Sequence, residues 1–183
     1  MDFYTVFKFL HVAAAMAWIG GGVTLFAMGM FAESRKDEAE MMRVLGSVGV
    51  MANRWFVPAS LLTLVFGLAM AALGNLWGDA WVVLGLAGFA ATFVTGHFVL
   101  RLKAMEAGRL MGDGKLAEAA AVGRKLMQVA KFDYTMLVTV VAVMVFKPAW
   151  SDYLMLAIVG AVLAIAAVVF IGVGLVRDEL TAT

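Results

Sequence analysis

The feature that most constrains this chain is a run of 24 residues, Phe9 to Ala32, without a formal charge. At about 1.5 Å per residue, a helix of this length crosses a hydrocarbon core of about 30 Å. Further uncharged runs occupy residues 57–76, 80–100 and 153–176, and a shorter one occupies residues 134–146. With flanking residues completing the short run, the sequence predicts five membrane-spanning helices, at about residues 7–31, 55–76, 80–102, 131–149 and 153–176.

The predicted fold class is an all-α, polytopic membrane helical bundle. The apolar runs are continuous, whereas the strands of a membrane barrel alternate between apolar and polar residues. Nearly the whole chain belongs either to the predicted spans or to two cytoplasmic segments, 33–53 and 104–130. Residues 1–183 are therefore expected to form a single transmembrane domain, with the lipid bilayer as its surroundings. The first span exceeds the apolar stretch of a signal peptide and should be retained. Cysteine is absent, which excludes thiolate ligands.

The distribution of basic residues predicts the orientation in the membrane. One side of the membrane receives 12 of the 14 Lys and Arg residues, and the other receives only Lys8 and Lys147. The twelve are Arg35, Lys36, Arg43, Arg54, Arg101, Lys103, Arg109, Lys115, Arg124, Lys125, Lys131 and Arg177. The N-terminus is therefore expected outside and the C-terminus in the cytoplasm. Because orientation explains these charges, they do not indicate a nucleic-acid partner.

Both predicted cytoplasmic segments have helical patterns. Ser34 is a candidate N-cap with Asp37 three residues later, and apolar residues then recur at helical spacing, as expected for a helix lying on the membrane. In the second segment, the turn Gly112-Asp113-Gly114 separates two helical stretches, which predicts a cytoplasmic hairpin.

His11 is an ionisable residue inside the first span, and such residues are candidates for functional sites. Lys8 lies three residues earlier on nearly the same helix face, where it could contact a haem propionate. Ala14 and Ala15 follow on that face and leave room for a flat macrocycle, and Trp18 could close its lower edge. Alternatively, a neutral His11 only forms a hydrogen bond to a neighbouring helix.

The second histidine, His97, precedes Arg101 by one helical turn, so this pair could also hold a carboxylate or propionate. Phe93 and Val94 crowd the same side. The alternatives are that His97 reaches towards the interface, or that it pairs with Asp133 at the start of the fourth span.

His11 and His97 lie near opposite ends of their spans, and the two spans run in the same direction. Their separation along the membrane normal is of the order of 20 Å, so one iron cannot bind both. A haem at either histidine needs another ligand, an open position or a second subunit. Histidine with methionines such as Met70, Met144 and Met155 would suit copper instead.

The segment Lys8-Phe9-Leu10-His11 and the later Trp18-Ile19-Gly20-Gly21-Gly22 carry a family resemblance. They resemble the first helix of a bacterial group of predicted integral membrane proteins of unknown function. They are also similar to the copper-resistance D-type proteins and the J-type protoporphyrinogen oxidase. In the oxidase-like branch the first-helix histidine is implicated in haem binding, and the matching position here is His11.

These observations predict a multi-pass protein of the bacterial inner membrane that binds b-type haem and acts in electron transfer or porphyrin handling. The metal ligands would be His11 and His97, with Lys8, Ala15, Trp18 and Arg101 in contact with the cofactor. One alternative is copper binding or transport through His11 and methionines. Another is a non-catalytic accessory or assembly subunit of a larger membrane complex. Besides the lipid bilayer, the expected partner is a second copy of the chain or such a larger complex. No motif indicates a particular enzyme activity.

Overall fold

The computed structural model describes residues 2–172, and every regular element in this range is helical. Five helical stretches within it are long and apolar enough to cross a membrane, which confirms the predicted fold class and number of spans. They are Phe3–Arg35, Glu38–Leu73, Ala80–Gly112, Leu116–Phe146 and Tyr153–Gly172. The end of the predicted fifth span, residues 173–176, and Arg177 lie outside the described residues.

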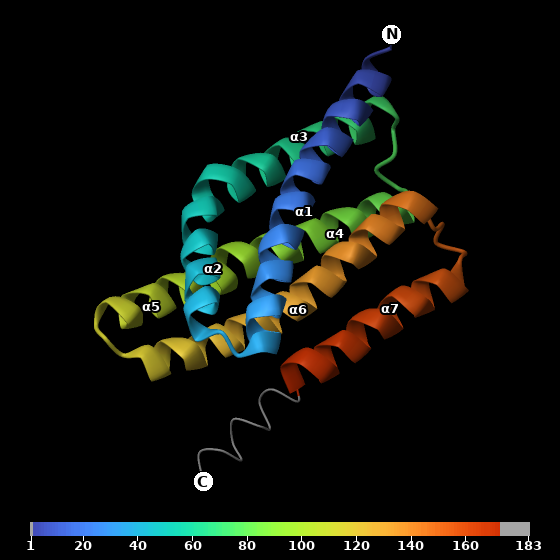
Figure 1. The fold of residues 1–183 in the computed structure, drawn as a ribbon. Coiled ribbons are helices and arrows are strands. Elements are labelled where there is room, and N and C mark those ends of the chain that lie inside the picture. Colours follow the sequence, from blue (N-terminus) through green and yellow to red (C-terminus); the bar gives the residue numbers. More distant parts are fainter. Residues whose placement is uncertain (1, 173–183) are drawn as a thin grey trace.

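The described part of the chain forms seven α-helices and three π-helical segments, and several of these are continuous (Figure 1). In chain order they are α1 (Phe3–Arg35), α2 (Glu38–Met51), η1 (Ala52–Phe56), α3 (Val57–Leu73), α4 (Ala80–Val94), η2 (Thr95–Leu100), α5 (Arg101–Gly112), α6 (Leu116–Phe146), α7 (Tyr153–Ala167) and η3 (Val168–Gly172). Most of the predicted cytoplasmic segments therefore extend the spanning helices beyond their apolar parts.

Successive connections alternate between the two ends of the bundle, as a multi-pass topology requires. Figure 1 places the α3–α4 and α6–α7 connections towards the N-terminus, and the α1–α2 and α5–α6 turns at the opposite end. At the first of these ends, Trp150 Nε1 donates a hydrogen bond to the Gly78 carbonyl at 3.0 Å, and the Lys147 ammonium lies 4.9 Å from the centre of the Trp81 ring. Indole rings at this end fit the predicted outer interface.

Carboxylates cap the first two helices. The Thr5 N–H donates to Asp2 at 2.6 Å, and this hydrogen bond holds the pKa of Asp2 below its usual value. At α2 the cap is Asp37, which accepts from the Glu40 N–H at 2.9 Å. The prediction of Ser34 as this cap was wrong, because α1 continues to Arg35 and the Ser34 hydroxyl donates to the Phe31 carbonyl.

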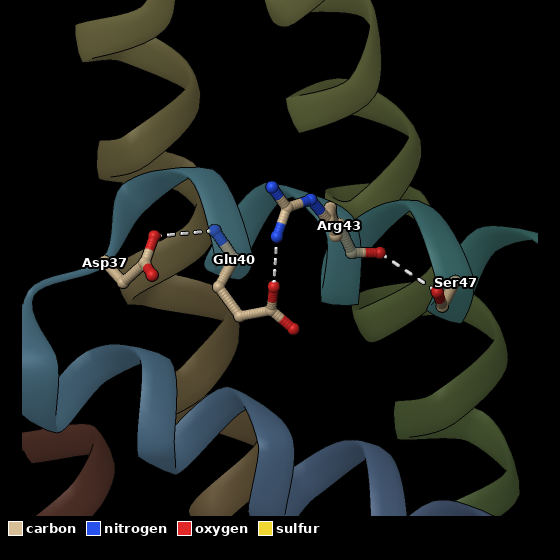
Figure 2. A network of polar contacts seen from close by, with 4 residues as sticks. All are labelled: Asp37, Glu40, Arg43 and Ser47. Carbon is tan, nitrogen blue, oxygen red and sulfur yellow. Dashed lines mark hydrogen bonds and ion pairs between the residues drawn. The ribbon is translucent and has the colours of Figure 1, made fainter.

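Exposed polar contacts continue along α2 (Figure 2). Glu40 pairs with Arg43, and the Ser47 hydroxyl donates to the Arg43 carbonyl at 3.0 Å. The opposite face of α2 is apolar, with Met41 and Leu45 buried in a core shared with α5 and α6. This face therefore packs against protein, and α2 continues through η1 into α3 instead of forming a separate helix on the membrane surface.

The main helix pairs are α1 with α3 and α4 with α6, while α5 and α6 form the predicted hairpin. The core cluster lies at the hairpin end and includes Ala32, Ala104, Ala107, Leu126 and Met127. Many large apolar side chains along the spanning helices are exposed, as expected for surfaces that face lipid. Helix α7 packs mainly on α6 and buries little more than Ala166.

Candidate functional sites at the two histidines

His11 lies where α1 packs against α3. Its Nδ1 is 2.7 Å from the Thr63 carbonyl oxygen. Because a carbonyl oxygen can only accept, Nδ1 carries the proton and donates, and the lone pair is on Nε2. Nε2 makes no hydrogen bond to the described residues and is not completely buried by them. His11 therefore offers one fixed and one open ring nitrogen, the arrangement that metal-binding histidines adopt.

A glycine allows this close approach of α1 and α3. A Cβ atom on Gly67 would lie 3.0 Å from both Cε1 and Nδ1 of His11, so the imidazole rests directly on the glycine backbone. Close to His11 and Gly67 on the same two helices, the rings of Phe7 and Phe66 contact each other, with centroids 6.1 Å apart. The position of the His11 ring is thus determined by contacts from α3.

Lys8 and Ala15 flank His11 on α1, whereas Trp18 belongs to a different site. Lys8 is exposed one turn earlier, and Ala15 is half-buried one turn later. Trp18 lies about 10 Å further along α1, where its ring contacts Phe89 edge-on at 5.4 Å. It lines a cavity that none of the other predicted His11 neighbours reaches.

This cavity, of about 140 Å³, lies between α1, α2, η1, α3, α4, η2, α6 and the first residue of α5. Its walls are mostly apolar, with aromatic residues that include Trp18, Phe26 and Phe93. The polar residues that line it are Ser60, Thr92, His97, Arg101, Asp133 and Tyr134. An apolar pocket with a few convergent polar groups is typical of a small-molecule site. The structure therefore brings Trp18, His97 and Arg101 together, but not with His11, Lys8 or Ala15.

His97 lies in η2, and its ring is held between two aromatic rings. Its ring stacks on Phe93, with centroids 5.9 Å apart and an interplanar angle of 4°, and contacts Phe98 edge-on at 5.0 Å. Its Nε2 lies 3.4 Å from a guanidinium nitrogen of Arg101. Since a guanidinium only donates, Nε2 accepts and the proton is on Nδ1. This Nδ1–H is buried and has no hydrogen-bond partner among the described residues.

Asp133 on α6 is a second buried polar group without a partner. Its side chain lines the cavity, the residue is 8% exposed, and Oδ1 has no hydrogen-bond partner in the described chain. The proposed alternative pairing of His97 with Asp133 does not occur, although the two residues line the same cavity. The adjacent cation, Lys131, instead pairs with Glu33 of α1 at 2.7 Å.

Tyr134 brings a hydroxyl group to the same cavity. Its ring stacks on Phe26 with centroids 4.5 Å apart, and its hydroxyl occupies the space where Gly22 lacks a Cβ atom. Asp133 and Tyr134 are not among the predicted site residues. A signal for Asp133 was present, because it is an acidic residue within the predicted fourth span.

Two departures from α-helical geometry border the cavity. In η1 the Val57 N–H bonds to the Ala52 carbonyl, and after η2 the Arg101 N–H bonds to the Gly96 carbonyl. Both are i to i+5 bonds, which occur often at functional sites. Pro58, which lacks an N–H, follows η1 and interrupts the regular ladder there. No proline or other feature of the described structure explains why η2, the segment that carries His97, departs from α-helical geometry.

The fold, with five helical stretches long and apolar enough to cross a membrane, defines a polytopic helical membrane protein. Residues 5–148 match the family model of predicted integral membrane proteins DUF2269, and the chain belongs to that family. The match extends from α1 to just beyond α6, and it includes both histidines but not α7. No curated protein and no solved structure matches the chain. The uncharacterised-family resemblance is thus confirmed, while similarity to copper-resistance D-type proteins and the J-type oxidase has no support from these comparisons.

Proposed function

We propose that this membrane protein binds b-type haem with His11 as an axial ligand, for electron transfer or porphyrin handling. The observation that carries the proposal is the orientation of the His11 ring. The hydrogen bond to the Thr63 carbonyl fixes the tautomer and leaves the Nε2 lone pair open to a metal.

The surroundings of His11 suit a cofactor at the surface of the bundle. Lys8, one turn before His11 and exposed, could pair with a propionate. Ala15 offers a small side chain one turn further along α1. When bound, haem would supply one-electron redox chemistry. The chain itself would hold and orient the cofactor through His11 and Lys8.

The cavity beside His97 does not fit haem. At about 140 Å³, it is the size of a cavity that holds one benzene molecule, whereas haem contains four pyrrole rings in one macrocycle. We therefore expect one haem per chain, or one per two chains if His11 residues of two copies clasp it from both sides. The incompletely buried position of His11 Nε2 favours a second ligand from outside this chain.

The test is the visible spectrum of the detergent-purified protein after haem is supplied. We expect a Soret band that shifts on reduction, and His11→Ala should lose most of the bound haem. His97→Ala is the matched control and should retain it, because its cavity is too small for the cofactor. Lys8→Ala should weaken retention moderately, since it removes one charge-assisted contact.

Added imidazole distinguishes a role of His11 as an iron ligand from a role in packing α1 against α3. If His11 binds iron, free imidazole should restore haem binding to His11→Ala, because it replaces the ligand without repairing the link to Thr63. Unchanged haem content in His11→Ala would contradict the assignment. Bound copper without a Soret band would favour the copper alternative through His11 and methionines. A protein that binds neither would favour an accessory subunit in a larger complex.

A further inference from the structure

The cavity beside His97 is closed on three sides by contacts between helices. On the α1–α6 side, the ring of Tyr134 stacks on Phe26. At the hairpin end, α2 packs against α5. At the opposite end of the cavity, the rings of Trp18 and Phe89 join α1 to α4.

The fourth side lies between η1–α3 and α4–η2. Helix α3 packs along α1 but has few contacts with α4, and the two run apart over most of their length (Figure 1). Phe56 and Val57 line the cavity on one flank, and Phe93, Gly96 and Leu100 line it on the other. All five are half-buried, and no hydrogen bond or ring contact within the described chain joins the two flanks. The cavity therefore has a lateral opening here, towards the lipid.

Arg101 supplies a positive charge beside this lateral opening. It lines the cavity and is the first charged residue after the uncharged run 80–100, so it lies at the boundary between hydrocarbon and headgroups. One guanidinium nitrogen is 3.4 Å from His97 Nε2, and Arg101 forms no ion pair with any described residue. Because a guanidinium has five N–H donors and binds phosphate bidentately, most of this capacity remains for an anion.

The rest of the lining is mostly apolar and suits hydrocarbon, as Leu25, Phe93 and Leu100 illustrate. The hydroxyl groups of Ser60 and Thr92 already donate to backbone carbonyls of their own helices. At about 140 Å³, the cavity takes only a piece of acyl chain about the size of benzene. A bilayer lipid needs no more, because the remainder of its chains stays in the surrounding hydrocarbon.

Asp133 is the one acidic residue among those that line the cavity. It belongs to the α1–α6 side, away from the lateral opening, and is 8% exposed. An anion that stays at the opening therefore meets Arg101 without entering beside this carboxyl group. The fully buried atoms His97 Nδ1 and Asp133 Oδ1 have no part in such a site.

We propose that the lateral opening binds one anionic phospholipid of the surrounding bilayer. Its phosphate would pair with Arg101 at the level of the headgroups, and part of one acyl chain would enter the cavity past Gly96. Basic sites between spanning helices are typical of acidic-lipid recognition. This site is separate from the proposed haem site, because Thr63 and Gly67, which contact His11, do not line the cavity.

Native mass spectrometry of the detergent-purified protein tests the proposal. The protein is titrated with phosphatidylglycerol and with phosphatidylcholine of the same acyl chains. Both lipids have a phosphate, but only phosphatidylcholine carries a cation that offsets its charge. Phosphatidylglycerol should bind at one saturable site, and more tightly than phosphatidylcholine by about fivefold or more.

Two variants assign the charge preference to one residue. Arg101→Gln should weaken phosphatidylglycerol by about fivefold or more and leave phosphatidylcholine nearly unchanged, so that the preference is lost. Arg54→Gln is the matched control, because Arg54 is an exposed cation of η1 that does not line the cavity. This variant should keep the preference.

A second pair of variants tests the entry of the acyl chain. Gly96 lines the cavity, and nothing lies within 4 Å of a Cβ atom built on it. Gly96→Leu should weaken both lipids to a similar degree, because the new side chain takes the space of the acyl chain. Gly108→Leu is the control at an equally open position outside the cavity. Thermal unfolding in detergent establishes that each variant is folded.

Equal affinities of the wild-type protein for the two lipids would overturn the proposal. So would a preference that survives Arg101→Gln, or one that Arg54→Gln reduces equally, because general attraction to cations would then explain it. Unchanged binding of both lipids to Gly96→Leu would contradict the entry of a chain. Competition by inorganic phosphate at millimolar concentrations would identify a free anion as the ligand instead. Haem content is measured on the same samples, so a failure here is distinguishable from a failure at His11.

Discussion

At the residue scale, the glycines of α1 have different roles although they are adjacent in the sequence. Nothing lies within 4 Å of a Cβ atom built on Gly20. A Cβ on Gly21 would lie 2.7 Å from the indole nitrogen of Trp55, which donates a hydrogen bond to the Ala17 carbonyl. A Cβ on Gly22 would overlap the Tyr134 hydroxyl. Gly22 is therefore needed for the contact between α1 and α6.

Gly22→Ala should lower the stability of the protein by about 1 to 3 kcal/mol, the usual cost of overpacking a filled site. The added methyl group would displace Tyr134 and disturb its stacking on Phe26. Thermal unfolding in detergent measures the effect. Gly20→Ala is the matched control, and its stability should be unchanged or slightly higher because alanine favours the helix. Equal melting temperatures for the two variants would contradict this account of Gly22.

At the element scale, the cytoplasmic end of the bundle depends on contacts between helices that are distant in the chain. The ion pair of Glu33 with Lys131 joins the C-terminal turn of α1 to α6. It lies beside the buried core that α2 forms with α5 and α6.

Reversing the two charges tests this contact. Glu33→Lys and Lys131→Glu should each lower the melting temperature, and the double variant should recover most of the loss. Since both side chains are partly exposed, we expect a coupling of about 0.2 to 1 kcal/mol. Glu106→Lys is a control, because Glu106 is exposed and forms no ion pair in the described chain. Additive losses in the double variant would show that the pair does not stabilise the fold.

At the scale of the whole molecule, the basic residues of the described chain fall mainly at the end that carries the α1–α2 and α5–α6 turns. The opposite end carries Lys147 and the indole rings of Trp81 and Trp150. This asymmetry predicts that the hairpin end faces the cytoplasm. The proposed haem site would then lie towards the outer side, and the cavity beside His97 towards the cytoplasm.

Reporter fusions along the chain check this orientation. A fusion after Lys115, in the turn between α5 and α6, should read as cytoplasmic. Fusions at Gly78 and Asp152, in the two connections at the other end, should read as periplasmic. The opposite pattern at all three sites would mean that the bundle is inverted. A cytoplasmic signal at Gly78 alone would contradict the alternation of the first three spans.

The sequence alone was sufficient for the fold class and the five spans, because the partition of a helix into lipid depends on the summed hydrophobicity of its own residues. It also showed that His11 and His97 lie at different depths, since the rise along a helix is nearly constant. Helix ends were less certain: the uncharged run 134–146 looked short, yet α6 extends from Leu116 to Phe146. A helix continues through polar residues wherever its packing and its hydrogen bonds allow.

Only the tertiary structure decided which residues share a site. His11 donates to Thr63, 52 residues away in the chain, and Trp18 joins His97, not His11. The cavity is made by side chains from all the helices α1 to α6 and from η1 and η2 together. Asp133 and Tyr134 enter it from a helix that holds neither histidine. Spacing within one helix defines which face a residue occupies. Which helix lies against that face depends on how all the helices pack together, and no single segment contains that information.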